Sequence, residues 1–198
     1  MNQPFIWVQE TLHNAIISLL LLVLFLAVVT DLYNRKIPNL LIVLGLFGSL
    51  FGQILLPQGL GFMQWSVGVL LGFICFFPLY ALRGMAAGDV KLMMVVGGFV
   101  GFPLVLTAAL YSYASGGVMA MMIVLAKGRF KQVLHNIKTI LTPLYIRVTS
   151  GVDISDGLSS KEGAEPVSVG RMPYALAIAA GTLLALYFEA TQMATISN

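Results

Sequence analysis

Hydrophobic residues run along this chain in long blocks, not in the short alternating or one-sided patterns of water-soluble elements. A helix needs about 20 mostly apolar residues to cross a hydrocarbon layer about 30 Å thick. Five blocks approach that length without a lysine or an arginine. We predict a membrane-spanning helix for each of them, over residues 11–30, 38–56, 65–82, 104–126 and 172–188.

A sixth, short helix is predicted between the third and the fourth of these blocks. The uncharged stretch between Lys91 and Lys127 is too long for one ordinary helix, and Gly101, Phe102 and Pro103 interrupt it. The short helix would cover residues 90–101. At about 1.5 Å per residue it reaches about half of the bilayer, so it is tilted, surrounded by thinned lipid, or enters from one face.

The composition agrees with a membrane protein. Of the 198 residues, 59% are hydrophobic and 10% are charged, whereas a soluble domain carries about 25% charged residues. This excludes a disordered chain and a nucleic-acid partner, and the lipid bilayer is the expected surroundings. Cys75 is the only cysteine, which excludes an intrachain disulfide and a cysteine-based zinc cluster. The predicted fold class is all-α: a polytopic membrane helix bundle of about six transmembrane helices, forming one domain over residues 1–198.

The positive charges predict the orientation, because lysine and arginine in short loops are retained on the cytoplasmic side. When the loop after the first span is placed inside, all 11 lysines and arginines fall in cytoplasmic segments. The outer segments 1–10 and 57–64, the turn at 102–103 and the C-terminal tail carry none. Both termini are therefore expected outside, and omitting the short helix would place Lys127 and its neighbours on the wrong side.

The longest predicted cytoplasmic segment is 127–171. Apolar residues recur at three- and four-residue spacing over 130–144, with lysines between them, so we predict an amphipathic helix lying on an anionic leaflet. Residues 150–166 are rich in Ser, Gly and Asp and are predicted to form a loop. Asp153 and Asp156 resemble part of a calcium loop, but the remaining ligands are missing, so no metal is expected.

Two of the eight carboxylates are not in evidently solvated segments. Asp31 closes the first span and Asp89 opens the short helix, and the predicted topology places both at the cytoplasmic membrane boundary. An ionisable group at membrane depth is costly and is a functional hypothesis by default. The structural alternatives are that Asp89, after Gly88, caps a helix and that Asp31 pairs with Arg35 one turn later.

Three segments resemble the type IV prepilin peptidases, membrane aspartic proteases of the GxGD class. The first runs from Asp31 to Asn39, the second contains Gly88 and Asp89, and the third lies within 171–181. They stand in the family's order, and the resemblance extends from about residue 19 to about residue 186. One departure is Ala86, which replaces the first glycine of the signature. Because alanine avoids positive φ angles, we expect an ordinary backbone there.

The resemblance implies that Asp31 and Asp89 form a catalytic dyad. Two adjacent carboxylates share a proton: the ionised one takes a proton from water, and the protonated one polarises the scissile carbonyl. No metal or cofactor is required. A serine or cysteine mechanism is disfavoured, because no nucleophile and histidine share a depth in the membrane. The supporting or substrate-binding residues implied are Arg35, Pro38, Asn39, Gly88, Lys91, Pro173 and Tyr174. Pro38 and Asn39 are expected to start the second span.

The implied substrate is a prepilin or pseudopilin precursor, cut after its leader glycine at the cytoplasmic face of the bacterial inner membrane. Longer family members carry Cys-x-x-Cys motifs and a linked N-methyltransferase activity. This chain has one cysteine, so it resembles the short, peptidase-only branch of tight-adherence (Flp/Tad) pilus systems, and no methyl transfer is expected.

Two other functions are compatible with parts of the pattern. A small proton- or cation-coupled transporter would use the same two acids, and a half-length helix ending in an acid is also a transporter feature. Transport sites lie near the midplane, however, whereas both acids are placed at one boundary. A non-catalytic assembly factor would tolerate Asp31→Asn and Asp89→Asn.

The glycine pairs 48 and 52, 68 and 72, and 97 and 101 predict close helix packing.

Overall fold

The computed structural model describes residues 3–55, 61–82, 84–126, 128 and 173–196. Within these ranges there are six α-helices and no β-strand, which confirms the predicted fold class. The chain divides into two compact units, residues 1–117 with 173–198, here called the first unit, and residues 118–172. Of the second, only 118–126 and 128 are described, so the predicted amphipathic helix and the 150–166 loop lie outside the described residues. The single domain stays a prediction.

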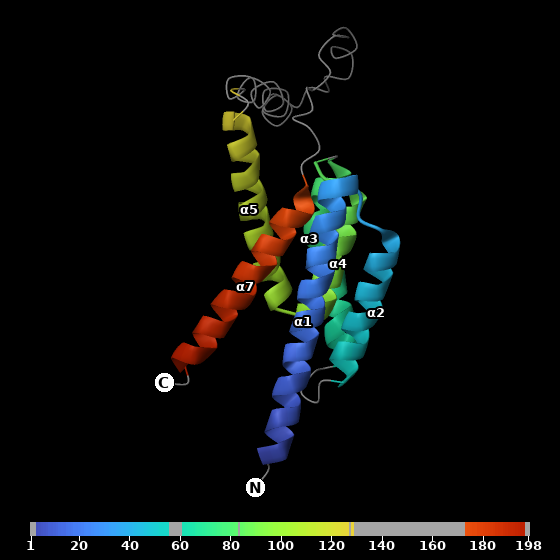
Figure 1. Ribbon diagram of the computed structural model, residues 1–198, viewed down its shortest axis with the longest axis vertical. Coiled ribbons are helices and arrows are strands. Elements are labelled where there is room, and N and C mark those ends of the chain that lie inside the picture. Colours follow the sequence, from blue (N-terminus) through green and yellow to red (C-terminus); the bar gives the residue numbers. More distant parts are fainter. Residues whose placement is uncertain (1–2, 56–60, 83, 127, 129–172, 197–198) are drawn as a thin grey trace, which may run out of the picture. The chain divides into compact units, whose positions relative to one another are not determined.

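The observed helices follow the predicted spans closely (Figure 1). Four of them, α1, α3, α5 and α7, are long and apolar enough to cross a membrane, and the protein is an integral membrane protein. The first helix begins before, and the last ends after, the predicted span. The helices are α1 (Gln3–Asn34), α2 (Asn39–Leu55), α3 (Phe62–Ala81), α4 (Ala87–Val100), α5 (Leu104–Ala126) and α7 (Tyr174–Ile196).

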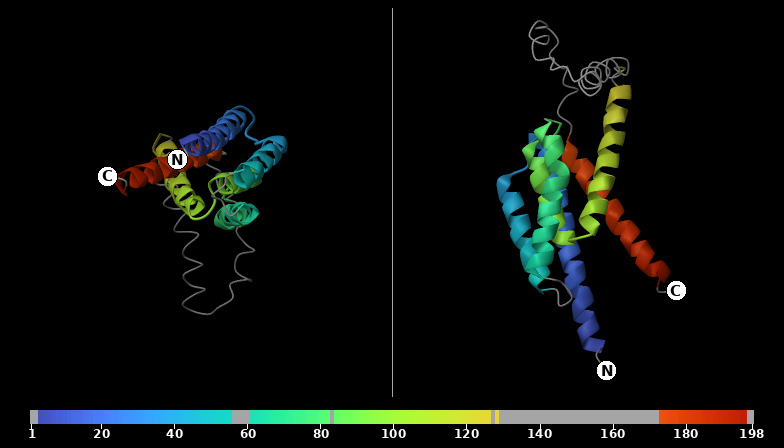
Figure 2. Two further views of the ribbon diagram at one scale, coloured as in Figure 1. Left: turned by 90° about the horizontal axis from the view of Figure 1, so that it is seen from below. Right: turned by 180° about the vertical axis from the view of Figure 1, so that it is seen from behind.

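The short helix α4 lies at the centre of the first unit. With 14 residues it is about 21 Å long, less than the hydrocarbon thickness. It packs against α3, α2, α7 and α1, and Figures 1 and 2 show α1 to α4 lying side by side. Its side chains Leu92, Met93, Val95 and Val96 are fully buried. The short element is therefore shielded from lipid by its neighbours.

Two glutamine side chains satisfy the backbone at the far end of α4. The last carbonyls of a helix have no intrahelical partner, and the hydrocarbon region supplies no water to replace one. Gln53 of α2, only 5% exposed, donates to the carbonyl of Phe99 at 2.9 Å and to that of Gly98 at 3.4 Å. Gln64 donates to the carbonyl of Phe102 at 2.7 Å. These bonds allow α4 to end inside the bundle.

Glycines bring α3 and α4 into backbone contact. A Cβ atom added at Gly68 would collide with the carbonyl of Gly97, and one added at Gly72 would collide with the carbonyl of Met93. The close packing predicted from the four-residue glycine spacing is confirmed at this interface. The position of α4 therefore depends on the absence of side chains at these points.

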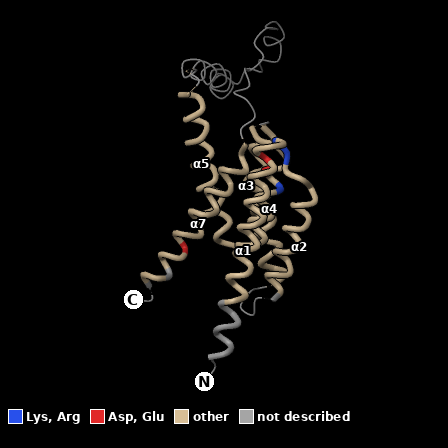
Figure 3. The backbone as a smooth tube through the Cα atoms, viewed as in Figure 1, with Lys and Arg blue, Asp and Glu red and all other residues tan. Residues whose placement is uncertain are grey.

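One end of the first unit gathers most of its described charges (Figure 3). At this end α1 and α3 finish, and α2, α4 and α7 begin. We call it the acid end, because Asp31 and Asp89 lie there. Glu189, on α7, lies away from the acid end.

Candidate active site

Asp31 lies near the end of α1 but is held by the last helix of the chain. Its side chain is 8% exposed. Its Oδ2 accepts a hydrogen bond from the backbone N–H of Ala175 at 3.2 Å, across 144 positions of sequence. Ala175 is in the first turn of α7, where backbone N–H groups have no intrahelical partner and the helix dipole favours negative charge. The start of α7 therefore positions this carboxylate.

Asp89 is held within its own helix. It is 5% exposed, and its Oδ2 accepts the backbone N–H of Ala86 at 3.1 Å. Because α4 begins at Ala87 and not at residue 90, Asp89 lies in the first turn and reaches back to the residue before the helix, as in half of a capping box. It is therefore not the N-cap itself. Ala86 has φ −82° and ψ 153°, the ordinary backbone expected for alanine here.

The two carboxylates come together at the acid end. They interact electrostatically, although they belong to different helices, and each is anchored by a backbone N–H at the start of a helix. The alternative ion pair between Asp31 and Arg35 is not formed within the described part of the chain. Arg35 follows the last residue of α1 with φ 51°, so it leaves the helical geometry that a one-turn pair requires.

Pro173 and Tyr174 lie at the start of α7, directly before the residue whose N–H binds Asp31. Pro173 directly precedes α7, where its missing N–H costs nothing, and its carbonyl accepts the N–H of Leu176 at 3.3 Å. Tyr174 interacts electrostatically with Asp89. Its ring packs edge-on against Phe76, with centroids 6.1 Å apart. These two residues thus define the helix start that supplies the N–H to Asp31.

Comparison with known families decides what kind of protein carries this pair of acids. The sequence profile of the type IV leader peptidase family matches residues 18–121, more than half of the chain and including both acids. The chain belongs to the type IV leader peptidase family. No curated protein and no solved structure matches it.

Two of the residues that the sequence predicted to support the site of this leader peptidase, Pro38 and Gly88, have local structural contacts. Pro38 accepts the N–H groups of Leu41 and Ile42 at 3.1 and 3.4 Å, so it starts α2 as expected. Gly88 lies beside Ile37, where an added Cβ would make an ordinary contact at 3.5 Å. Among the described residues, no three His, Cys, Asp or Glu side chains gather where they could hold a metal ion.

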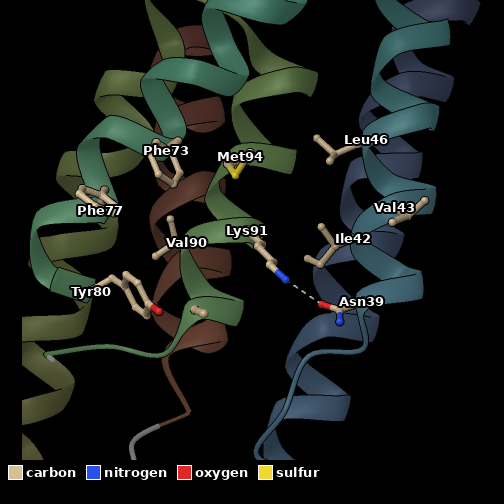
Figure 4. Close-up of a pocket in the computed structure, with 11 residues that line it drawn as sticks. Asn39, Ile42, Val43, Leu46, Phe73, Phe77, Tyr80, Val90, Lys91 and Met94 are labelled. Atoms are coloured by element: carbon tan, nitrogen blue, oxygen red, sulfur yellow. Dashed lines mark hydrogen bonds between the residues drawn. The ribbon is translucent and has the colours of Figure 1, made fainter.

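Asn39 and Lys91 of the peptidase form a separate pair. The ammonium group of Lys91 donates to the side-chain oxygen of Asn39 at 3.0 Å (Figure 4). At about 100° per residue, Lys91 lies about 200° around α4 from Asp89, on the opposite face of the helix. The sequence places Lys91 two residues from Asp89, and the inclusion of both residues in α4 puts their side chains on opposite faces of the helix.

Proposed function

We propose that this leader peptidase is an aspartic endopeptidase in which Asp31 and Asp89 form the catalytic dyad. The observation that carries the proposal is the meeting of two buried carboxylates from α1 and α4, each with its own backbone N–H partner. Two buried carboxylates that interact electrostatically cannot both ionise cheaply in a poorly solvated site, so we expect them to retain a shared proton. A shared proton supplies an acid and a base at one place, which is what general acid–base hydrolysis needs.

The second oxygen of each carboxylate is available for chemistry. The Oδ2 atoms are occupied by Ala175 and Ala86, and no buried side-chain oxygen or nitrogen in the described ranges lacks a partner. We propose that each Oδ1 is the oxygen that water and the substrate approach. This leaves one anchored and one reactive oxygen on each acid.

In the proposed reaction the ionised carboxylate accepts a proton from a water molecule, whose oxygen attacks the scissile carbonyl carbon. The protonated carboxyl donates its hydrogen to the carbonyl oxygen as negative charge develops there. When the tetrahedral diol collapses, the C–N bond breaks, the leaving nitrogen takes a proton from one carboxyl of the dyad, and one hydroxyl of the diol returns its proton to the other carboxylate. The products are a carboxylic acid and an amine, and the dyad again holds one proton.

We infer the substrate and its location from the family and the site together. The substrate is a prepilin or pseudopilin precursor of Flp/Tad type, cut after its leader glycine at the cytoplasmic boundary of the bacterial inner membrane, with both termini of the enzyme outside. The acids lie where helices end, which agrees with a bond at a membrane boundary better than with a transport site near the midplane. Arg35 is exposed at the same end and is proposed to hold the substrate by donating hydrogen bonds to its carbonyl or carboxylate oxygens.

The test uses the purified full-length protein and a pilin precursor in detergent. We expect Asp31→Asn and Asp89→Asn each to lower the rate of leader removal by about 100- to 10,000-fold. Glu189→Gln, an acid-to-amide change on α7 away from the acid end, is the matched control and keeps the wild-type rate. Circular dichroism verifies that all variants are folded. If either Asn variant cuts at the wild-type rate, the dyad is refuted. If neither the wild type nor the variants cut the precursor, a non-catalytic assembly role is favoured.

The same preparation tests the proposed absence of methyl transfer. Incubation with S-adenosylmethionine and the mature pilin should leave the pilin N-terminus unmethylated, as measured by mass spectrometry. Methylated product would refute the peptidase-only assignment but would not bear on the proposed catalytic dyad.

A further inference from the structure

The first unit contains an apolar groove on the side of α4 that faces away from the acids. It has a volume of about 480 Å³ and lies between α2 and α3, with α4 as its floor (Figure 4). This volume is within the usual range for small-molecule sites. The apolar side chains that line it include Ile42, Leu46, Phe73, Phe77, Val90 and Met94.

The groove opens toward lipid. Val43 and Phe77 line it and are 45% and 44% exposed. Both belong to helices of the apolar bundle, so the medium that meets them is hydrocarbon. Exposed apolar side chains are expected there and do not mark a binding site by themselves. The decisive feature is the polar pair at one end of the groove.

Lys91 places a positive charge at the end of the groove nearest the acid end (Figure 4). Its hydrogen-bond partner is the neutral side-chain oxygen of Asn39. Over the described ranges no carboxylate forms an ion pair with Lys91, because Asp89 lies on the opposite face of α4 with its carboxylate on Ala86. With its oxygen used by Lys91, the amide NH₂ of Asn39 still has hydrogens to donate. A cation and an amide donor thus lie together at one end of the apolar groove.

We propose that this groove binds an anionic phospholipid from the leaflet that meets the acid end. One acyl chain lies along the apolar walls, and the phosphate lies against the ammonium of Lys91 and the amide of Asn39. The lining residues on α2 run from Asn39 to Leu46, about 10 Å of helix. A spanning helix would need a far longer seat of about 30 Å, whereas a flexible chain fits. Basic pockets between membrane helices are suited to anionic head groups.

Binding is tested with the detergent-purified full-length protein and two probes that share their acyl chains, dioleoylphosphatidylglycerol and dioleoylphosphatidylcholine. Native mass spectrometry measures the retention of each. The wild type should prefer the anionic lipid, and Lys91→Gln should lower that preference about fivefold. Lys36→Gln is the matched control, since Lys36 is an exposed lysine near the same end but outside the groove.

A second pair of variants tests the acyl chain. Val43→Trp fills the groove and should abolish most retention of both lipids, whereas Leu44→Trp, on the adjacent exposed position outside the groove, should not. A photoreactive benzophenone side chain at position 77 should cross-link to phosphatidylglycerol. The proposal is overturned if Lys36→Gln acts like Lys91→Gln, if Val43→Trp binds both lipids as the wild type does, or if an added pilin precursor replaces lipid in the cross-link.

Discussion

The contact between α3 and α4 makes a sharp prediction for Gly68→Ala. The new Cβ atom would lie 2.8 Å from the carbonyl carbon of Gly97 and 3.0 Å from the Cα of Gly101. Carbon contacts become ordinary only beyond about 3.4 Å. Both of these carbon atoms belong to the backbone of α4 or of the residue that follows it, so no side-chain rotation can relieve the collision. The helices α3 and α4 must therefore move apart by more than about half an ångström.

The cost follows from this rigidity. Overpacking a close contact costs typically about 1–3 kcal/mol, and backbone against backbone belongs at the upper part of that range. Alanine recovers about 0.5–1 kcal/mol of helix propensity over glycine. The net expectation is a loss of about 2 kcal/mol, or about a 30-fold fall in the folded-to-unfolded ratio.

Gly117→Ala is the matched control within α5. An added Cβ there meets nothing within 4 Å, so only the propensity gain of about 0.5–1 kcal/mol remains. The two variants should therefore shift stability in opposite directions. Reversible unfolding of the purified protein in mixed detergent and SDS, followed by circular dichroism, gives both free energies of unfolding.

The double variant Gly68→Ala with Gly97→Ala sharpens the test. Each added Cβ collides with the carbonyl of the other glycine, so separating the helices once relieves both collisions. The combined loss should fall short of the sum of the single losses by about 0.5–3 kcal/mol. A Gly68→Ala protein as stable as the wild type, or strictly additive losses, would refute the close contact of α3 and α4.

Three further pairs of variants probe other features by the same unfolding measurement. Arg35→Gly should raise the free energy of unfolding by about 1 kcal/mol, because the φ angle of 51° at this position strains any residue with a side chain. Arg35→Ala keeps a Cβ atom and should not raise the free energy of unfolding. A rise for Arg35→Ala would contradict the argument from backbone strain. Gln53→Leu should lower it by about 1–3 kcal/mol, since two carbonyls of α4 lose their donor. Gln64→Leu should lower the free energy of unfolding by less than Gln53→Leu, because the hydrogen bond of Gln64 to the carbonyl of Phe102 is exposed. An equal loss for the two variants would contradict the argument that burial sets the cost. Tyr174→Phe should leave the free energy of unfolding nearly unchanged, because the lost hydroxyl lies 3.5 Å from the carbonyl of Ser112, a long hydrogen bond. Tyr174→Ala also removes the ring and should lower the free energy of unfolding by about 3–5 kcal/mol. Similar losses for both variants would show that the packing of the ring does not stabilise the fold.

The helix positions were predictable because bilayer thickness sets the length of an apolar run. Even α4 was predictable, since the charge bias requires an extra crossing before Lys127. Its first residue was not. The sequence suggested a start near residue 90, but the side chain of Asp89 bonds the N–H of Ala86 and so extends the first turn to Ala87. A backbone bond of this kind leaves little trace in a hydrophobicity pattern.

The shared depth of Asp31 and Asp89 was also predictable from the number of crossings between them. The partner of Asp31 was not, because a backbone N–H carries no side-chain signature. Pro173 is the one signal nearby, since proline favours a helix start, but it does not say which acid that start will meet. The placement of Lys91 on the opposite face from Asp89 does follow from helical periodicity once the start of α4 is known.

The two acids differ in how their geometry is maintained, and this difference explains why the last helix belongs to the site. Asp89 is held by a residue three positions away, so α4 alone preserves its orientation. Asp31 depends on Ala175 across the length of the chain, so its orientation requires α7 to be docked. The helix α7 contacts α1 and α4 and packs closely against α5. Ser115 of α5 donates to the carbonyl of Ala177 at 2.7 Å, and a side chain at Gly181 would collide with the backbone of α5. The dyad is therefore a property of the assembled bundle, complete only when the final helix joins it.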